Sequence, residues 1–177
     1  GFDPMFGKAD MDNFAAAVRA AGIRNIDGGI IGNRTLKDTL KWGSGWCWDD
    51  GMPLLTPLLC ERTDSFIPMF RQALVAQGIM LADTLGSYVE EAPDSVLTLV
   101  AESRRRLPEV MDRMMKKSDN LHAEALFYHL AAMGSEKQHY ASADDGAKMI
   151  HKMIRRVGHQ PGRFLMADGS GVSLYNY

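Results

Sequence analysis

The residues best placed to do chemistry are a serine and an asparagine that lie two positions apart at a break between two amphipathic segments. Ser118, Asp119 and Asn120 directly follow Lys117. Apolar residues recur at helical spacing before and after this break, so we expect two helices joined by a short turn. On such a turn Ser118 and Asn120 lie side by side and the residue between them points elsewhere. The triplet therefore presents one hydroxyl and one carboxamide on a rigid corner.

The same triplet also suits a purely structural role. Ser, Asp and Asn are the residue types that accept hydrogen bonds at the start of a helix, so the triplet could be only a helix end followed by an N-cap. The two roles are compatible. For Asp119 we predict the cap rather than a catalytic role, and we expect Glu124 to support the helix that follows the turn.

A second group of candidate residues lies about 50 residues further on, at Asp168-Gly169-Ser170-Gly171. Glycines allow positive φ and Asp bonds its neighbouring backbone, so this stretch predicts a turn. It is not a nucleophile elbow, which requires Gly-x-Ser-x-Gly. We expect a structural loop beside the corner at Ser118, with contact between Ser170 and a substrate as the alternative.

The elements that must position these residues are mostly helices. Periodicity predicts a helix from Asp10 to Ala21, one from Asp64 or Ser65 to Gln77, and one from Pro108 to Lys117. Two more follow, one carrying Leu121 to Ala131 and one opened by Ser142 or Asp144 and reaching Val157. Strands are predicted over three short stretches, 26–31, 95–101 and 163–167. Residues 42–51 are rich in Gly and Trp and are expected to form an ordered loop.

Composition excludes several classes of function. The 177 residues are 46% hydrophobic and 24% charged, which is typical of a globular chain. The net charge of −2 provides no basic face for nucleic acid. No stretch of about 18 apolar residues could span a membrane. The start, Gly1-Phe2-Asp3-Pro4, lacks signal-peptide regions and an initiator Met, from which we expect a processed or partial chain.

Metal and disulfide chemistry have little support in the pattern. The five histidines form no HExxH and have no cysteine partners at zinc spacing, so we expect packed or surface histidines and no metal site. The adjacent carboxylates Asp49 and Asp50 diverge and have no evident partner. Cys47 and Cys60 could form one bridge in an exported chain or stay as free thiols. The tryptophans could offer a stacking surface, but we expect them to anchor the irregular loop: Trp42, Trp46 and Trp48.

Taken together, these motifs resemble the penicillin-binding D-alanyl-D-alanine carboxypeptidase/endopeptidase family (type 4, class C). Ser-x-Asn belongs to the signature of serine acyltransferases that bind penicillin, together with SxxK and Lys-Thr-Gly. The family commonly reads Asp-Gly-Ser-Gly-Leu-Ser-Arg-x-Asn at the second motif, where this chain has Val172 and Leu174 in place of the Leu and Arg. Further likeness lies in Phe2-Asp3-Pro4 and in the stretch Gly45-Trp-Cys-Trp-Asp-Asp50.

The resemblance implies roles for the candidate residues. Ser118 would relay a proton toward the leaving group, and Asn120 would hold the catalytic Lys and the substrate amide. The candidate substrate-binding residues are those of the second motif: Asp168, Gly169, Ser170 and Gly171. The family's nucleophilic Ser and its Lys lie in SxxK, and its Lys-Thr-Gly strand binds the substrate carboxylate; neither motif occurs in these 177 residues. We therefore expect this chain alone to be inactive and to take no label from fluorescent penicillin.

The predicted fold is α+β. It combines part of a serine β-lactamase/transpeptidase-like domain, with helices packed on an antiparallel sheet, over residues 95–177, and part of an inserted α/β subdomain over residues 1–94. The implied activity is cleavage of D-Ala-D-Ala peptide bonds in peptidoglycan stem peptides, in the periplasm or cell envelope, with β-lactam binding and no cofactor. Two alternatives remain open: a non-catalytic envelope module that binds muropeptides or a partner protein, and a helical interaction domain with a chance Ser-Asp-Asn.

Overall fold

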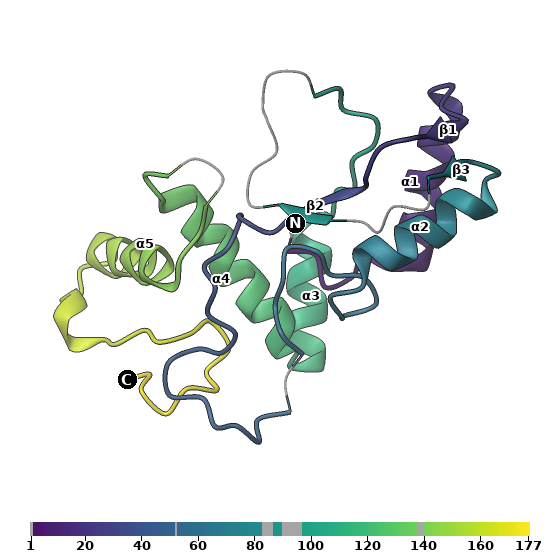
Figure 1. The fold of residues 1–177 in the computed structure, drawn as a ribbon. Coiled ribbons are helices and arrows are strands. Elements are labelled where there is room, and N and C mark those ends of the chain that lie inside the picture. Colours follow the sequence, from purple (N-terminus) through teal and green to yellow (C-terminus); the bar gives the residue numbers. More distant parts are fainter. Residues whose placement is uncertain (1, 52, 83–86, 90–96, 138–139) are drawn as a thin grey trace. The chain divides into compact units, whose positions relative to one another are not determined.

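The structure is a computed structural model that describes residues 2–51, 53–82, 87–89, 97–137 and 140–177 (Figure 1). The chain forms two compact units built from interleaved stretches. The first unit consists mainly of Asp3–Arg34 and Thr56–Arg105, and the second of Thr35–Leu55 and Arg106–Tyr177. The predicted boundary between residues 94 and 95 stays a prediction, because the two units do not divide the chain at one point.

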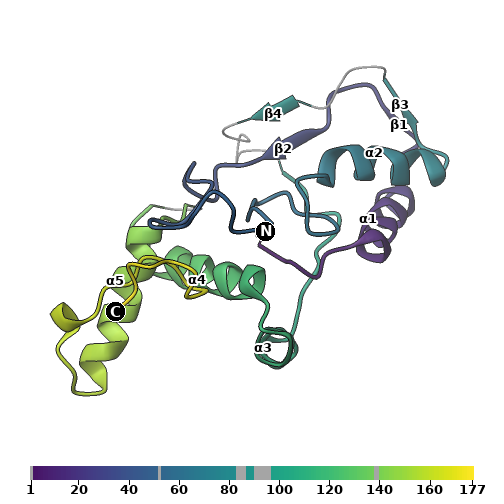
Figure 2. The same ribbon diagram turned by 90° about the horizontal axis from the view of Figure 1, so that it is seen from below.

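The first unit pairs two helices with short parallel strands. Helices α1 (Lys8–Ala20) and α2 (Phe66–Ala76) lie side by side (Figure 2). Strand β1 (Asn25–Ile26) pairs in parallel with β3 (Met80–Leu81), and β2 (Ile31–Asn33) pairs in parallel with β4 (Ser87–Val89). The core of this unit is apolar and comprises Phe6, Met11, Ala15, Cys60, Ala73, Leu74 and Ile79.

Helix α1 begins slightly earlier than its sequence predicts. Asp10 was expected as the cap, but Gly7 holds that position and donates its N–H to Asp10 Oδ2 at 3.1 Å. The carboxylate also contacts Arg105, whose Nη2 lies 2.5 Å from the same oxygen. Burial would raise the pKa of Asp10, but the hydrogen bonds and charge of Arg105 and the N–H of Gly7 outweigh it and hold that pKa below its usual range.

The second unit is built on three helices and a C-terminal loop. They are α3 (Leu107–Lys117), α4 (Asn120–Gly134) and α5 (Ala143–Arg156), followed by the 3₁₀ turn η2 (Pro161–Arg163). Pro108 lies in the first turn of α3, as predicted, where its missing N–H costs no helical hydrogen bond. Ser142 caps α5 by accepting from Asp145 N at 3.2 Å. The buried core of this unit contains Phe2, Ala125, Phe127, Tyr128, Ala131 and Ala141.

The predicted strands are where the sequence reasoning was least accurate. The stretch 26–31 contains the end of β1 and the start of β2 rather than one strand. Residues 95 and 96 lie outside the described residues, and 97–101 adopt no regular element. The stretch 163–167 is not a strand, although Leu165 and Tyr177 exchange both backbone hydrogen bonds, as in an antiparallel pair. In the described residues the strand pairs are parallel and lie in the first unit, so the antiparallel sheet expected for the second half is not found among them.

Candidate functional site

The predicted corner forms where α3 ends and α4 begins. Asp119 is the N-cap of α4, and its Oδ1 accepts from Leu121 N at 3.1 Å and from His122 N at 3.4 Å, which confirms the predicted cap. Asn120 is the first residue of α4 and is half-buried, whereas Ser118 is exposed. Neither residue is buried in the core. Burial of both would have favoured the alternative of a helical domain with a chance Ser-Asp-Asn.

Ser118 has an unusual backbone conformation for a residue with a side chain. Its φ of 50° and ψ of 49° lie in the left-handed region at the end of α3. Glycine is the usual residue at this position after a helix, because a Cβ costs about 1–2 kcal/mol there. Glu61 and Arg62 are the other described residues with a side chain and a positive φ. The conformation makes Ser118 a candidate for a functional role, and that role stays a prediction.

A buried histidine, His122, lies beside the Asp119 cap. His122 is 1% exposed, and its Nδ1 lies 3.0 Å from Asp119 Oδ2. Arg113 on α3 approaches the same carboxylate, with its Nε 4.0 Å from Oδ2. His122 is therefore a packed residue beside the cap, one of the two placements predicted for the histidines. Among the described residues, no three His, Cys, Asp or Glu side chains converge to hold a metal ion.

The loop Asp168–Gly171 is organised around a buried carboxylate. Asp168 is 2% exposed. Its Oδ1 accepts from Gly171 N at 2.8 Å and Asn176 Nδ2 at 2.7 Å, and its Oδ2 accepts from Ser173 N at 2.6 Å and Trp46 Nε1 at 2.5 Å. Four donors satisfy the charge without a cation. The predicted structural role of the loop thus has a physical basis, whereas substrate contact by its residues stays a prediction.

Trp46 carries out the anchoring that was expected of all three tryptophans. Its indole N–H donates to Asp168, and Ser173 Oγ of the same C-terminal loop donates to Ser44 O at 2.5 Å. These two hydrogen bonds connect the Gly-rich segment to the C-terminal loop. Trp42 and Trp48 are 51% and 88% exposed and take no part in this anchor. Asp50 holds the local turn by accepting from Cys47 N at 2.7 Å.

Glu124 joins the loop to α4. It is 4% exposed, and its Oε1 accepts from Gly169 N at 2.9 Å and Ser170 N at 2.8 Å. Burial raises the pKa of the Glu124 carboxyl above its usual range and the negative charge of Asp168 adds to this, while the hydrogen bonds from Ser170 and Gly169 act in the opposite direction. Glu124 was expected to support the helix after the turn, but its hydrogen-bond partners lie in the C-terminal loop.

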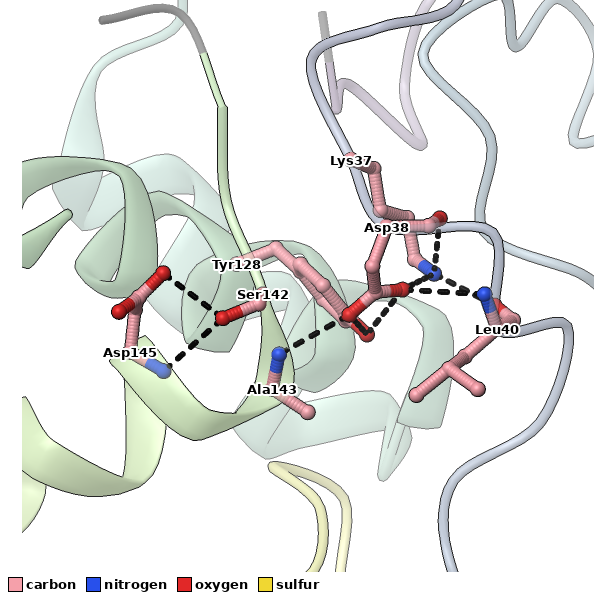
Figure 3. A network of polar contacts seen from close by, with 7 residues as sticks. All are labelled: Lys37, Asp38, Leu40, Tyr128, Ser142, Ala143 and Asp145. Carbon is pink, nitrogen blue, oxygen red and sulfur yellow. Dashed lines mark hydrogen bonds and ion pairs between the residues drawn. The ribbon is translucent and has the colours of Figure 1, made fainter. Parts of the chain in front are cut away.

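A second polar cluster, not foreseen from the sequence, lies further along α4 (Figure 3). The Asp38 carboxylate accepts from Tyr128 Oη at 3.2 Å, Ala143 N at 3.0 Å and Lys37 Nζ at 2.8 Å. Lys37 is 8% exposed, and its Nζ also donates to Leu40 O at 2.6 Å. Burial and the adjacent Asp38 charge raise the pKa of Tyr128. The cluster fastens the segment Thr35–Leu55 to α4 and α5, and no local sequence motif marks it.

A cavity of about 250 Å³ lies between α4, the C-terminal loop and the segment 35–55. Its polar lining includes Lys37, Lys41, Glu124 and Asp144, and its aromatic lining includes Phe127, Tyr128 and Tyr175. Ser118 and Asn120 are not among the lining residues of this cavity. The corner at Ser118 and Asn120 is therefore not part of this pocket.

The α+β arrangement, the Ser-x-Asn corner and the loop anchored by Asp168 are features expected from the resemblance to the penicillin-binding serine peptidases. The chain belongs to the D-Ala-D-Ala carboxypeptidase 3 (S13) family, whose model matches residues 59–177. The family resemblance inferred from the motifs is thereby confirmed.

Individual relatives are known by sequence and by structure. D-alanyl-D-alanine carboxypeptidase DacB of Haemophilus influenzae is 31% identical over 86 residues, which cover 49% of this chain and 18% of the relative. The crystal structure of penicillin binding protein 4 (dacB) from Haemophilus influenzae matches 99% of this chain and 56% of that chain, with a TM-score of 0.86 and 17% identity. Its complex with a novel β-lactam matches with a TM-score of 0.68 and 18% identity. These matches confirm the predicted fold class, and the chain spans about half the length of the solved relative.

Proposed function

We propose that this chain is part of a serine-type D-Ala-D-Ala carboxypeptidase or endopeptidase that cleaves peptidoglycan stem peptides through an acyl-enzyme. Ser118 Oγ relays a proton toward the leaving group, and the Asn120 carboxamide holds the catalytic Lys and the substrate amide. The observation that carries this proposal is the exposed Ser118 hydroxyl in a left-handed conformation at the α3–α4 corner of an S13-family chain. Activity at the cell envelope and binding of β-lactams are part of the same proposal.

The role proposed for Ser118 comes from the family resemblance, and elementary catalysis is consistent with it. A serine hydroxyl is too weak a nucleophile at neutral pH without a nearby base, and no Ser-x-x-Lys pair occurs in these 177 residues. Ser118 is followed three positions later by Leu121. The family resemblance assigns it a proton-transfer role instead, in which a positioned group contributes about 10²–10⁴-fold. The nucleophile and the carboxylate-binding Lys-Thr-Gly strand would come from other segments of a longer polypeptide.

The test is covalent labelling by a fluorescent penicillin. The polypeptide encoded by the complete reading frame is expected to take the label, and Ser118→Ala and Asn120→Ala are each expected to slow labelling about 10²-fold or more. Ser103→Ala is the control of the same length, because Ser103 is a half-buried serine of the first unit, and this variant should label at the wild-type rate. The 177 residues alone should not be labelled, and a covalent adduct on them would show that the nucleophile has been misplaced.

The alternative is a non-catalytic envelope module that binds muropeptides or a partner protein, and it would gain support if the complete reading frame lacked both SxxK and Lys-Thr-Gly. The same experiment separates the two. A complete reading frame without a serine–lysine pair, which takes no label but binds a muropeptide, would replace the hydrolase with the binding module. In the described part of the chain, no helix is long and apolar enough to cross a bilayer.

A further inference from the structure

One face of α4 carries a polar residue at every turn. Asn120, Glu124 and Tyr128 are spaced four residues apart, so they lie above one another along the helix. The first belongs to the corner, the second bonds the loop Asp168–Gly171, and the third bonds Asp38. Glu124 thus lies one turn from Asn120 and in the middle of this series. This one turn of helix is the path by which we expect the position of Glu124 to affect the corner.

The loop lies flush against α4 at this point. The two successive N–H groups of Gly169 and Ser170 converge on one oxygen of Glu124. A Cβ at residue 169 would meet the Phe127 side chain and would lie 2.9 Å from Ala123 O, which leaves room only for glycine. The hydrogen bonds of Glu124 and the close packing at Gly169 therefore both hold the backbone of the loop against the backbone of α4.

Among the described residues, no cationic side chain is bonded to the buried Glu124 carboxylate. The ionisable groups that share its surroundings are Asp168 on the loop, Tyr128 on α4, Lys37 and Lys41 on the segment 35–55, and Asp144 on α5. Lys37 is already engaged by Asp38 and Leu40. A buried charge costs free energy unless it is hydrogen-bonded, so Glu124 is tolerated here because of its bonds to the loop.

We propose that Glu124 is a positioning residue of the Ser118–Asn120 site: its carboxylate clamps the Asp168–Gly171 loop to the first turns of α4, so that loop and corner move as one body. The proposal rests on the proposed function for its catalytic meaning, but the clamp itself is a property of this chain. Gln keeps the accepting oxygen at the same reach, Ala removes it, and Asp is one methylene too short.

The clamp is tested by amide hydrogen exchange, followed by NMR on the 177-residue chain. In Glu124→Ala the Gly169 and Ser170 amides are expected to lose about tenfold or more of their protection, with Glu124→Asp intermediate and Glu124→Gln close to wild type. Glu136 is exposed and lies just beyond the end of α4 at Gly134. Glu136→Ala is therefore the matched control and should leave the protection of both amides unchanged. Unchanged protection in a folded Glu124→Ala chain overturns the clamp. If that variant does not fold, the Glu124→Asp and Glu124→Gln chains decide: equal protection in both overturns it as well.

The link to the corner is tested separately on the complete reading frame. Glu124→Ala is expected to slow acylation by fluorescent penicillin at least about tenfold through misplacement of the catalytic groups, and Glu124→Gln is expected to restore most of the rate. Loss of protection without any loss of acylation rate would leave the clamp but overturn its positioning role. Absence of acylation in the wild-type polypeptide would refute the proposed function and leave the exchange result standing.

Discussion

The buried carboxylate of Asp168 offers the sharpest test of how the second unit is held together. Asp168→Ala removes the acceptor for four donors that come from Trp46, Gly171, Ser173 and Asn176. We expect this change to lower the free energy of unfolding of the second unit more than any other substitution in the C-terminal loop.

The magnitude follows from the number of donors left without a partner. Each buried unsatisfied group costs about 1–3 kcal/mol, so four donors set an upper bound of roughly 4–12 kcal/mol. The actual loss is smaller because the loop can open and expose some donors to water, and we expect about 3–5 kcal/mol. Asp168→Asn keeps one accepting oxygen but turns an NH₂ toward N–H donors, so about 1–2 kcal/mol should be lost.

The assay is urea unfolding followed by tryptophan fluorescence. All three tryptophans lie in the segment 42–48, which belongs to the second unit, so the signal reports that unit. Asp112→Ala is the control, since Asp112 is an exposed residue on α3 whose ion pair with Lys116 is worth less than about 1 kcal/mol. An Asp168→Ala chain that unfolds within about 0.5 kcal/mol of wild type would refute the reasoning, because the carboxylate would not then anchor the loop.

Three further predictions follow from single sites. Gly169→Ala should lower the free energy of unfolding by about 1–3 kcal/mol because its Cβ meets Phe127 and the backbone of α4, whereas Gly162→Ala, with open space around it, should stay within about 0.5 kcal/mol. In the native chain, a thiol reagent at pH 8 should modify the exposed Cys47 and spare the fully buried Cys60. Burial and the nearby charges of Glu61 and Asp10 raise the pKa of Cys60 to about 11. Equal rates of modification would contradict this prediction. The folded chain holds the Glu124 proton more tightly than the unfolded chain does, because the pKa of Glu124 is raised on folding. Wild type should therefore lose stability relative to Glu124→Gln as the pH rises from about 4.5 through the raised pKa of the folded state. A pH-independent difference in urea midpoint between the two chains would refute this.

Local patterns were sufficient to predict the helices and one part of the site. Each of the five predicted helices is present, with ends within a few residues, because helical periodicity and capping act between residues close in sequence. The break at Lys117–Asn120 and the cap at Asp119 follow from the same local rules. The turn at Asp168–Gly171 could also be predicted, because Asp and Gly form such turns through hydrogen bonds to nearby backbone.

Tertiary structure alone decided what those local elements are attached to. Trp46 and Asp168 are separated by 122 residues, Glu124 and Gly169 by 45, and Asp38 and Tyr128 by 90. No spacing rule joins residues at such separations, because their meeting depends on how the helices pack and where the irregular segment 35–55 runs. The same reason explains the strands: a short apolar stretch becomes a strand only when a partner lies beside it, and the stretch 163–167 finds only Tyr177. The sequence alone therefore determined the helices and the residues at their corner, whereas packing decided which buried donors and acceptors meet around the C-terminal loop.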